Sequence, residues 1–185
     1  MIITILAEPR SGSTNLTNWF YFNKNFTTLF EPENTGSKWF QNGIQPKDYK
    51  YKTKHLCIKE IYYPNVNWDL LLNVSDKIIV LYRENTQEQL ESFLNAWNTG
   101  NWHLPYIYEN PKKPITKEKT EYFNILKSEF KEKYVNKDFF TISYEELYYN
   151  NGFEKIVNYL NIDEVRNIGF PTGNKYRINK TKTLI

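Results

Sequence analysis

The sequence has few of the residues that build disulfides and metal centres. Its 185 residues include one cysteine, Cys57, and two histidines, His55 and His103. A single cysteine excludes an internal disulfide framework and a cysteine-rich zinc site, and two histidines are too few for a histidine-dominated metal centre. We therefore expect a protein without a bound metal in a reducing compartment, which points to the cytoplasm.

Long apolar runs and a strong excess of one charge are also missing. The first apolar run, Ile2 to Ala7, stops at Glu8 and Pro9, well short of the ~18 apolar residues that a membrane helix needs. We therefore expect no signal peptide, no membrane anchor and no membrane partner. Lys and Arg number 24 against 21 for Asp and Glu, and the net charge of +3 fits an anionic ligand but not a strongly basic nucleic-acid binder.

What is present is an alternation of short apolar runs with amphipathic segments. With 40% apolar and 17% aromatic residues, the chain 1–185 is long enough for one sizeable core and too short for two domains. The runs predict strands at 2–7, 28–32, 55–61, 77–83 and 138–143. The amphipathic segments predict helices after Gly12, at 68–72, between Arg83 and Gly100, at 117–135 and at 153–160, with loops at 33–54 and 101–115. This order predicts an α/β fold, a single three-layer domain with a parallel sheet flanked by helices.

The segment Pro9–Asn15 joins the first predicted strand to the first predicted helix. It reads Pro-Arg-Ser-Gly-Ser-Thr-Asn, so backbone amides, hydroxyls and the positive end of a helix dipole converge there, as a phosphate site requires. The loop lacks the spacing and the lysine of a Walker loop, and Arg10 supplies the cation instead. The alternative is a capped helix after a tight turn.

A second candidate group follows the fourth predicted strand. Arg83 stands at the end of that strand and Ser92 lies nine residues later on the next helix. Ligands of open parallel sheets bind at the carboxyl ends of the strands, so Arg83 and the Pro9–Asn15 loop should face one crevice. There Arg83 and Ser92 can bind a second phosphate. The alternative for Arg83 is a surface salt bridge.

Together the two motifs resemble those of the sulfotransferases that use 3′-phosphoadenosine 5′-phosphosulfate. Pro9–Thr14 resembles their 5′-phosphosulfate loop, and Ile78–Arg83 with Ser92 resembles their 3′-phosphate strand and helix. The resemblance covers residues 2–100 and, by the Arg83 to Ser92 spacing, is nearest the bacterial trehalose or carbohydrate branch. It implies an enzyme that needs no metal and transfers a sulfuryl group to a hydroxyl or amine of a small-molecule or carbohydrate acceptor.

The resemblance also implies roles for individual residues. Arg10 would hold the 5′-phosphate and the sulfuryl group, and Arg83 and Ser92 the 3′-phosphate. The remaining phosphate contacts would come from Ser11, Gly12, Ser13 and Thr14. Glu31, at the end of the second predicted strand in Phe-Glu-Pro-Glu, resembles the catalytic base of carbohydrate-modifying members.

The assignment of the base leaves alternatives open. Glu33 and Glu60 are reserve candidates, and Glu31 could simply be a carboxylate paired with a lysine or a backbone amide. Lys59 could stabilise the leaving group or pair with Glu31 or Glu60. The basic segment 174–182 is either a nucleotide lid or a solvated tail.

Other functions stay open beside the sulfotransferase. A nucleotide-binding kinase-like protein would need a Mg²⁺-binding aspartate near a strand end, and none follows the first or fourth predicted strand. A sulfotransferase-like protein without catalysis would keep Arg10, Arg83 and Ser92. A single-stranded nucleic-acid binder is disfavoured by the small net charge, so we expect no nucleic-acid partner. Homo-oligomerisation is also open, because a second copy of so short a chain could complete the acceptor pocket.

Overall fold

The computed structural model describes residues 1–34, 38–39, 42–50, 52–64, 66, 68–100, 102, 116–135 and 137–163. Five strands form one sheet, namely β1 (Ile2–Ala7), β2 (Phe26–Phe30), β3 (His55–Ile61), β4 (Lys77–Tyr82) and β5 (Phe140–Ser143). The strand order is β2-β3-β1-β4-β5 and every neighbouring pair is parallel. The predicted α/β fold with a parallel sheet is confirmed.

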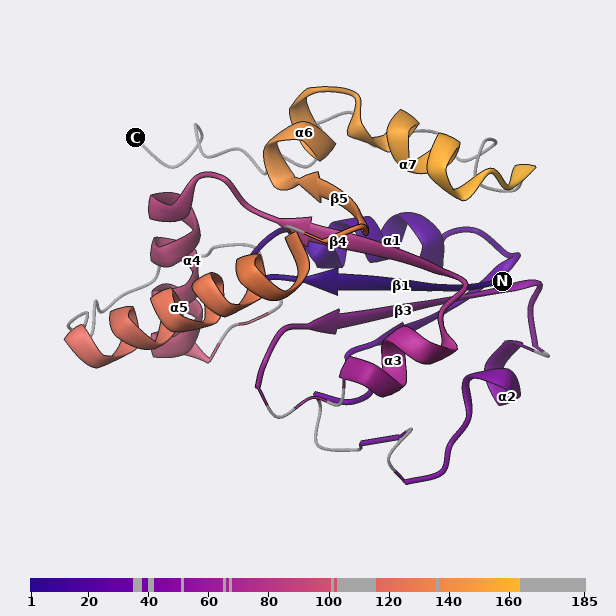
Figure 1. Ribbon diagram of the computed structural model, residues 1–185, viewed down its shortest axis with the longest axis horizontal. Helices are drawn as coiled ribbons and strands as arrows, with labels where there is room; N and C mark the ends of the chain where they lie inside the picture. The colour runs from indigo at the N-terminus through magenta and orange to yellow at the C-terminus, as the bar shows by residue number, and fades with distance from the viewer. Residues whose placement is uncertain are drawn as a thin grey trace.

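The carboxyl ends of the central strands are level with one another. Ala7 at the end of β1 is in register with Ile61 of β3 and Leu81 of β4. In Figure 1 the arrowheads of β1 and β3 point to the side of the molecule where α4 lies. Whatever follows these strands therefore gathers along one edge of the sheet.

Helices cover both faces of the sheet. They are α1 (Ser13–Tyr21), α2 (Pro46–Lys50), α3 (Trp68–Val74), α4 (Thr86–Thr99), α5 (Lys117–Phe130), the π-helix η1 (Lys131–Val135), α6 (Tyr144–Tyr149) and α7 (Gly152–Leu160). One buried apolar cluster joins the sheet to α1, α6 and α7, and a second joins it to α3, α4, α5 and η1. Consecutive strand residues point to opposite faces, so Ile5 belongs to the first cluster and Leu6 to the second. Figure 1 shows the resulting layers.

The strand connections diverge at the end of β1. This strand continues into α1 on one face, whereas its two neighbours, β3 and β4, continue into α3 and α4 on the other face. A topological switch of this kind opens the sheet edge between the diverging loops and is where α/β proteins bind ligands. The fold therefore places the loops after β1 and β4 beside a natural ligand position.

Several boundaries differ from those predicted. β2 begins at Phe26 rather than residue 28, and the predicted 117–135 helix is divided into α5 and η1. The short helices α2 and α6 were not expected, because five or six residues contain too few turns to show a period of 3.6. On α4, Trp97 is 40% exposed, and its ring makes an edge-to-face contact with Phe93.

Two predicted regions fall wholly or largely beyond these residues. The basic segment 174–182 and all of the 101–115 connector except Trp102 lie outside the described residues. Within the described part, no helix is both long and apolar enough to cross a membrane. The same part of the chain contains no cluster of three or more histidine, cysteine or carboxylate side chains suited to hold a metal ion.

Candidate functional site

The loop after β1 presents backbone amides at the start of α1. Gly12 is the N-cap residue with φ 82°, and no side chain caps the helix, so the predicted alternative of a capped helix is not what forms. Among the described residues, nothing accepts a hydrogen bond from the amides of Gly12, Ser13 or Thr14. Three unpartnered amides at the positive end of a helix dipole form an arrangement that binds an anion.

One hydroxyl of the loop is used internally. Ser11 is fully buried, and its Oγ donates to the carbonyl oxygen of Glu8 at 2.8 Å, which tightens the turn. The Ser11 side chain thus stabilises the loop in this structure and does not face the ligand position. Ser13 and Thr14 lie at the start of α1, where the resemblance to the sulfotransferases implies phosphate contacts.

Arg10 brings the two sequence motifs together. Its Nε donates to Ser92 Oγ on α4 at 2.8 Å, and its Nη1 donates to the carbonyl oxygen of Trp102 at 2.5 Å. Arg10 and Ser92 are 82 residues apart in the chain. The loop after β1 and the helix after β4 are therefore in contact, as one candidate site requires.

Arg83 is held by residues of α4 and α6. Its Nη2 donates to Glu88 Oε2 at 2.5 Å, and its guanidinium carbon lies 4.6 Å from the centre of the Tyr144 ring. Glu145 adds a second carboxylate, 3.8 Å from Nε. The side chain of Arg83 is only 11% exposed, so the salt bridge weighed as an alternative does form, but in a packed position rather than on an open surface.

Two tyrosines of α6 pack against the loop and were missed by sequence reasoning. The Tyr148 hydroxyl donates to the Gly12 carbonyl oxygen at 2.8 Å. A Cβ added at Gly12 would lie 2.7 Å from Tyr144 Cδ2, so only glycine fits between the loop and these rings. Tyr144 therefore contacts both Gly12 and Arg83, and it links the two candidate phosphate-binding groups.

A buried polar network fixes the loops after β1 and β4 to α5. Glu8 Oε2 accepts hydrogen bonds from the Arg83 amide at 3.0 Å, Gln89 Nε2 at 2.9 Å and Lys127 Nζ at 3.1 Å. Lys127 also donates to the Arg83 carbonyl oxygen and to Gln89 Oε1. Burial lowers the pKa of Lys127, and the Glu8 carboxylate raises it in opposition. The only sequence signal for this network is a glutamate directly after an apolar strand.

The predicted base and its lysine meet at the ends of β2 and β3. Lys59 Nζ donates to Glu31 Oε1, and Asn34 Nδ2 donates to Glu31 Oε2 at 3.2 Å. Lys59 is buried, whereas the Glu31 side chain is 14% exposed. Of the open alternatives, Lys59 pairs with Glu31 at the end of the sheet.

Glu60 and Glu33, the reserve bases, lie deeper than Glu31. Both are buried, and Glu60 Oε1 accepts from the Glu33 amide at 2.5 Å. Burial raises the pKa of Glu60 to about 8; the carboxylates of Glu31 and Glu33 also raise it, while the Glu33 amide and Lys59 lower it. Glu60, with its pKa raised by burial and its side chain closed off from solvent, is therefore a poor candidate for the base.

Two predicted site residues occupy strained backbone conformations. Arg10 has φ 62° and Glu31 has φ 52°, in the left-handed region that side chains other than glycine, asparagine and aspartate rarely adopt. Such residues cost on the order of 1 kcal/mol or more each and tend to cluster at functional sites. The strain is independent support for the loops after β1 and β2 as parts of the site.

The comparisons with known proteins add no family to these observations. No family model matches the chain, and no curated protein matches it significantly. The function therefore has to be argued from the geometry of the site and from the motifs.

Proposed function

We propose that the protein is a sulfotransferase that uses 3′-phosphoadenosine 5′-phosphosulfate and acts in the cytoplasm on a small-molecule or carbohydrate acceptor. The observation that carries the proposal is the hydrogen bond from Arg10 to Ser92, because it unites the two motifs on which the resemblance rests. It also fits a donor that carries phosphate groups on both the 5′ and the 3′ oxygen of its ribose, because such a donor needs two neighbouring anion sites.

The described residues suit such a donor. The amides of Gly12, Ser13 and Thr14, with the Arg10 guanidinium, would hold the 5′-phosphosulfate. Arg83 and Ser92 would hold the 3′-phosphate, and Arg83 Nη1 has no partner among the described residues. Glu88 competes with a phosphate for Arg83, so binding requires Arg83 to share or exchange this carboxylate.

Transfer requires a base, cations and in-line placement, and no metal has to take part. The donor supplies an activated sulfur: the acceptor oxygen forms a bond to sulfur while the bond from sulfur to the phosphate oxygen breaks. Glu31 would take the proton of the acceptor hydroxyl. Arg10 would offset the charge that develops on the phosphate oxygen, and the hydrogen bond from Lys59 would position Glu31.

One observation favours a second candidate, a sulfotransferase-like protein that binds the nucleotide without turning it over. Both oxygens of Glu31 accept hydrogen bonds, from Lys59 and Asn34, which lowers their availability as a base. This candidate shares the nucleotide site, so the two functions differ only in turnover.

Calorimetric titration with 3′-phosphoadenosine 5′-phosphate tests the shared nucleotide site, with ATP and 5′-AMP as competing ligands. We expect micromolar binding that needs the 3′-phosphate and that Arg83→Ala weakens about ten-fold or more, as the loss of a charged hydrogen bond does. Lys117→Ala is the matched control, because the Lys117 side chain is 91% exposed on α5 and pairs only with Glu121 among the described residues. Preference for ATP with Mg²⁺ would instead favour the kinase-like alternative, and binding without turnover on any acceptor would favour the inactive one.

A further inference from the structure

Three polar residues follow the carboxyl ends of three neighbouring strands of the sheet. In the strand order β2-β3-β1, Glu31 follows β2, Tyr63 comes two residues after β3, and Arg10 comes three residues after β1. The strand ends are hydrogen-bonded to one another, because the Glu31 amide donates to the Lys59 carbonyl oxygen at 2.7 Å and the Tyr62 amide donates to the Ala7 carbonyl oxygen at 2.8 Å. Tyr63 therefore emerges between the predicted base and the predicted phosphate-binding arginine.

The surroundings of Tyr63 keep its hydroxyl protonated. The side chain is half-buried at the end of the sheet and packs against both apolar clusters. Burial raises the pKa of Tyr63, the Glu31 carboxylate raises it further, and the Arg10 guanidinium lowers it. Because the charges of both Glu31 and Arg10 act on the Tyr63 hydroxyl, Tyr63 lies near both residues, as the strand order also indicates. At neutral pH the hydroxyl is a hydrogen-bond donor and not a base.

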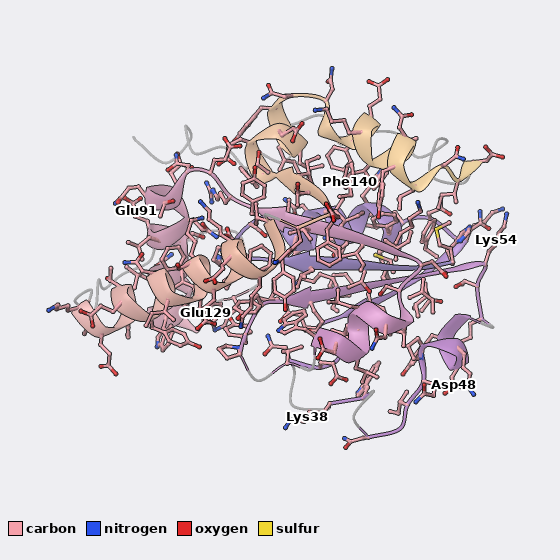
Figure 2. The ribbon with its side chains drawn as sticks, in the orientation of Figure 1. Lys38, Asp48, Lys54, Glu91, Glu129 and Phe140 are labelled. Atoms are coloured by element: carbon pink, nitrogen blue, oxygen red, sulfur yellow. The ribbon has the colours of Figure 1, made fainter. Side chains whose placement is uncertain are left out.

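The Tyr63 hydroxyl has no role in holding the described part of the fold. The backbone of Tyr63 is anchored, since its carbonyl oxygen accepts from Trp68 Nε1 and from the Val66 amide, each at 3.2 Å. Within the described chain, however, no group pairs with its hydroxyl. The adjacent Tyr62 differs, because its hydroxyl donates to Glu129 Oε2 at 2.7 Å, and Figure 2 shows Glu129 on α5.

We propose that the Tyr63 hydroxyl donates a hydrogen bond to the sulfuryl group of the bound donor. This inference rests on the proposed function. The sulfuryl group passes from the phosphate held near Arg10 to an acceptor deprotonated by Glu31, and Tyr63 lies between these two residues. A neutral donor suits an anionic group there, because it stabilises negative charge without adding a cation that would compete for Glu31.

The test compares two nucleotides that differ only by the sulfuryl group. Affinities of wild type and Tyr63→Phe are measured for 3′-phosphoadenosine 5′-phosphate and for 3′-phosphoadenosine 5′-phosphosulfate, with intact donor verified after each titration. Tyr63→Phe removes a hydroxyl and keeps the packed ring, so we expect an unchanged melting temperature. We expect about ten-fold weaker binding of the sulfated nucleotide and unchanged binding of the unsulfated one.

Tyr62→Phe is the matched control, since it removes the neighbouring hydroxyl, which is bonded to Glu129 on the α5 side. It should leave the ratio of the two affinities at the wild-type value. If Tyr63→Phe weakens the binding of both nucleotides equally, or of neither, the inference is overturned while the proposed function stands. Failure of the wild-type protein to bind either nucleotide overturns both.

Discussion

Glu8 and Lys127 form an ion pair of 3.1 Å in the interior of the protein, although 119 residues separate them. Glu8 follows β1 and Lys127 belongs to α5, so the pair joins the start of the candidate phosphate loop to a helix far along the chain. Because Lys127 also bonds the Arg83 carbonyl oxygen, the pair sets the relative position of the loops after β1 and β4.

Replacing Lys127 should destabilise the protein strongly. Lys127→Met leaves the Glu8 charge buried without its cation, which typically costs about 3–5 kcal/mol of the free energy of unfolding. The double variant Glu8→Gln with Lys127→Met should recover part of this loss, because neither charge remains. Urea denaturation measures the free energy of unfolding of the single and the double variant. The control is Lys117→Met, which breaks the exposed Lys117–Glu121 pair and should change this free energy by less than about 1 kcal/mol. If Lys117→Met lowered the free energy of unfolding as much as Lys127→Met does, the stabilising role of the Glu8–Lys127 pair would be contradicted.

Gly12 should be irreplaceable for steric reasons that go beyond its backbone angle. Gly12→Ala would force a methyl group to 2.7 Å from the Tyr144 ring, whereas a methyl group added at Gly43, which has a similar φ of 86°, would meet nothing within 4 Å among the described residues. Gly43→Ala therefore has the same kind of backbone strain without the clash. We expect Gly12→Ala to lower the thermal midpoint more than Gly43→Ala and to abolish nucleotide binding, as measured by calorimetry. Equal effects of the two variants would show that strain alone matters.

The buried Glu60 should make stability depend on pH. Its pKa is raised from 4.5 to about 8 in the folded protein, so between these values the folded state holds a proton that the unfolded state releases. The free energy of unfolding should therefore fall as pH rises from about 5 to 8, by on the order of 3 kcal/mol, and then level off. Denaturation of wild type and Glu60→Gln at several pH values measures this slope. Glu60→Gln should remove most of it, and an unchanged slope in the variant would refute the assignment.

Glu31→Gln should separate binding from turnover. The amide keeps the shape of the carboxylate but cannot accept the acceptor proton, so we expect unchanged affinity for 3′-phosphoadenosine 5′-phosphate and a fall in kcat of about 10²-fold or more. The measurement is transfer from labelled donor to a verified acceptor, with calorimetry on the same samples. Full activity in Glu31→Gln would mean that another group is the base.

The order of elements could be predicted from the sequence because each element has a local signature. Runs such as Ile2–Ala7 and His55–Ile61 are apolar at nearly every position, as strands covered on both faces must be, and the inward residues of α5 recur at helical spacing. The loop after β1 could also be located from the sequence, because glycine and hydroxyl residues at a strand-to-helix junction are typical of phosphate-binding loops, although they are typical of capped helix starts as well. The π-helix η1 and the short α6 were not predictable from such patterns.

The sequence alone determined that strands and helices alternate and that Arg10, Arg83 and Ser92 lie near strand ends or on the following helix. Only the tertiary structure decided which polar groups meet: Arg10 with Ser92, Lys59 with Glu31, and Lys127 with Glu8. The physical reason is that apolar burial is repetitive and recorded in local spacing, whereas a buried polar group is satisfied by whichever partner the packing of distant elements brings within about 3 Å.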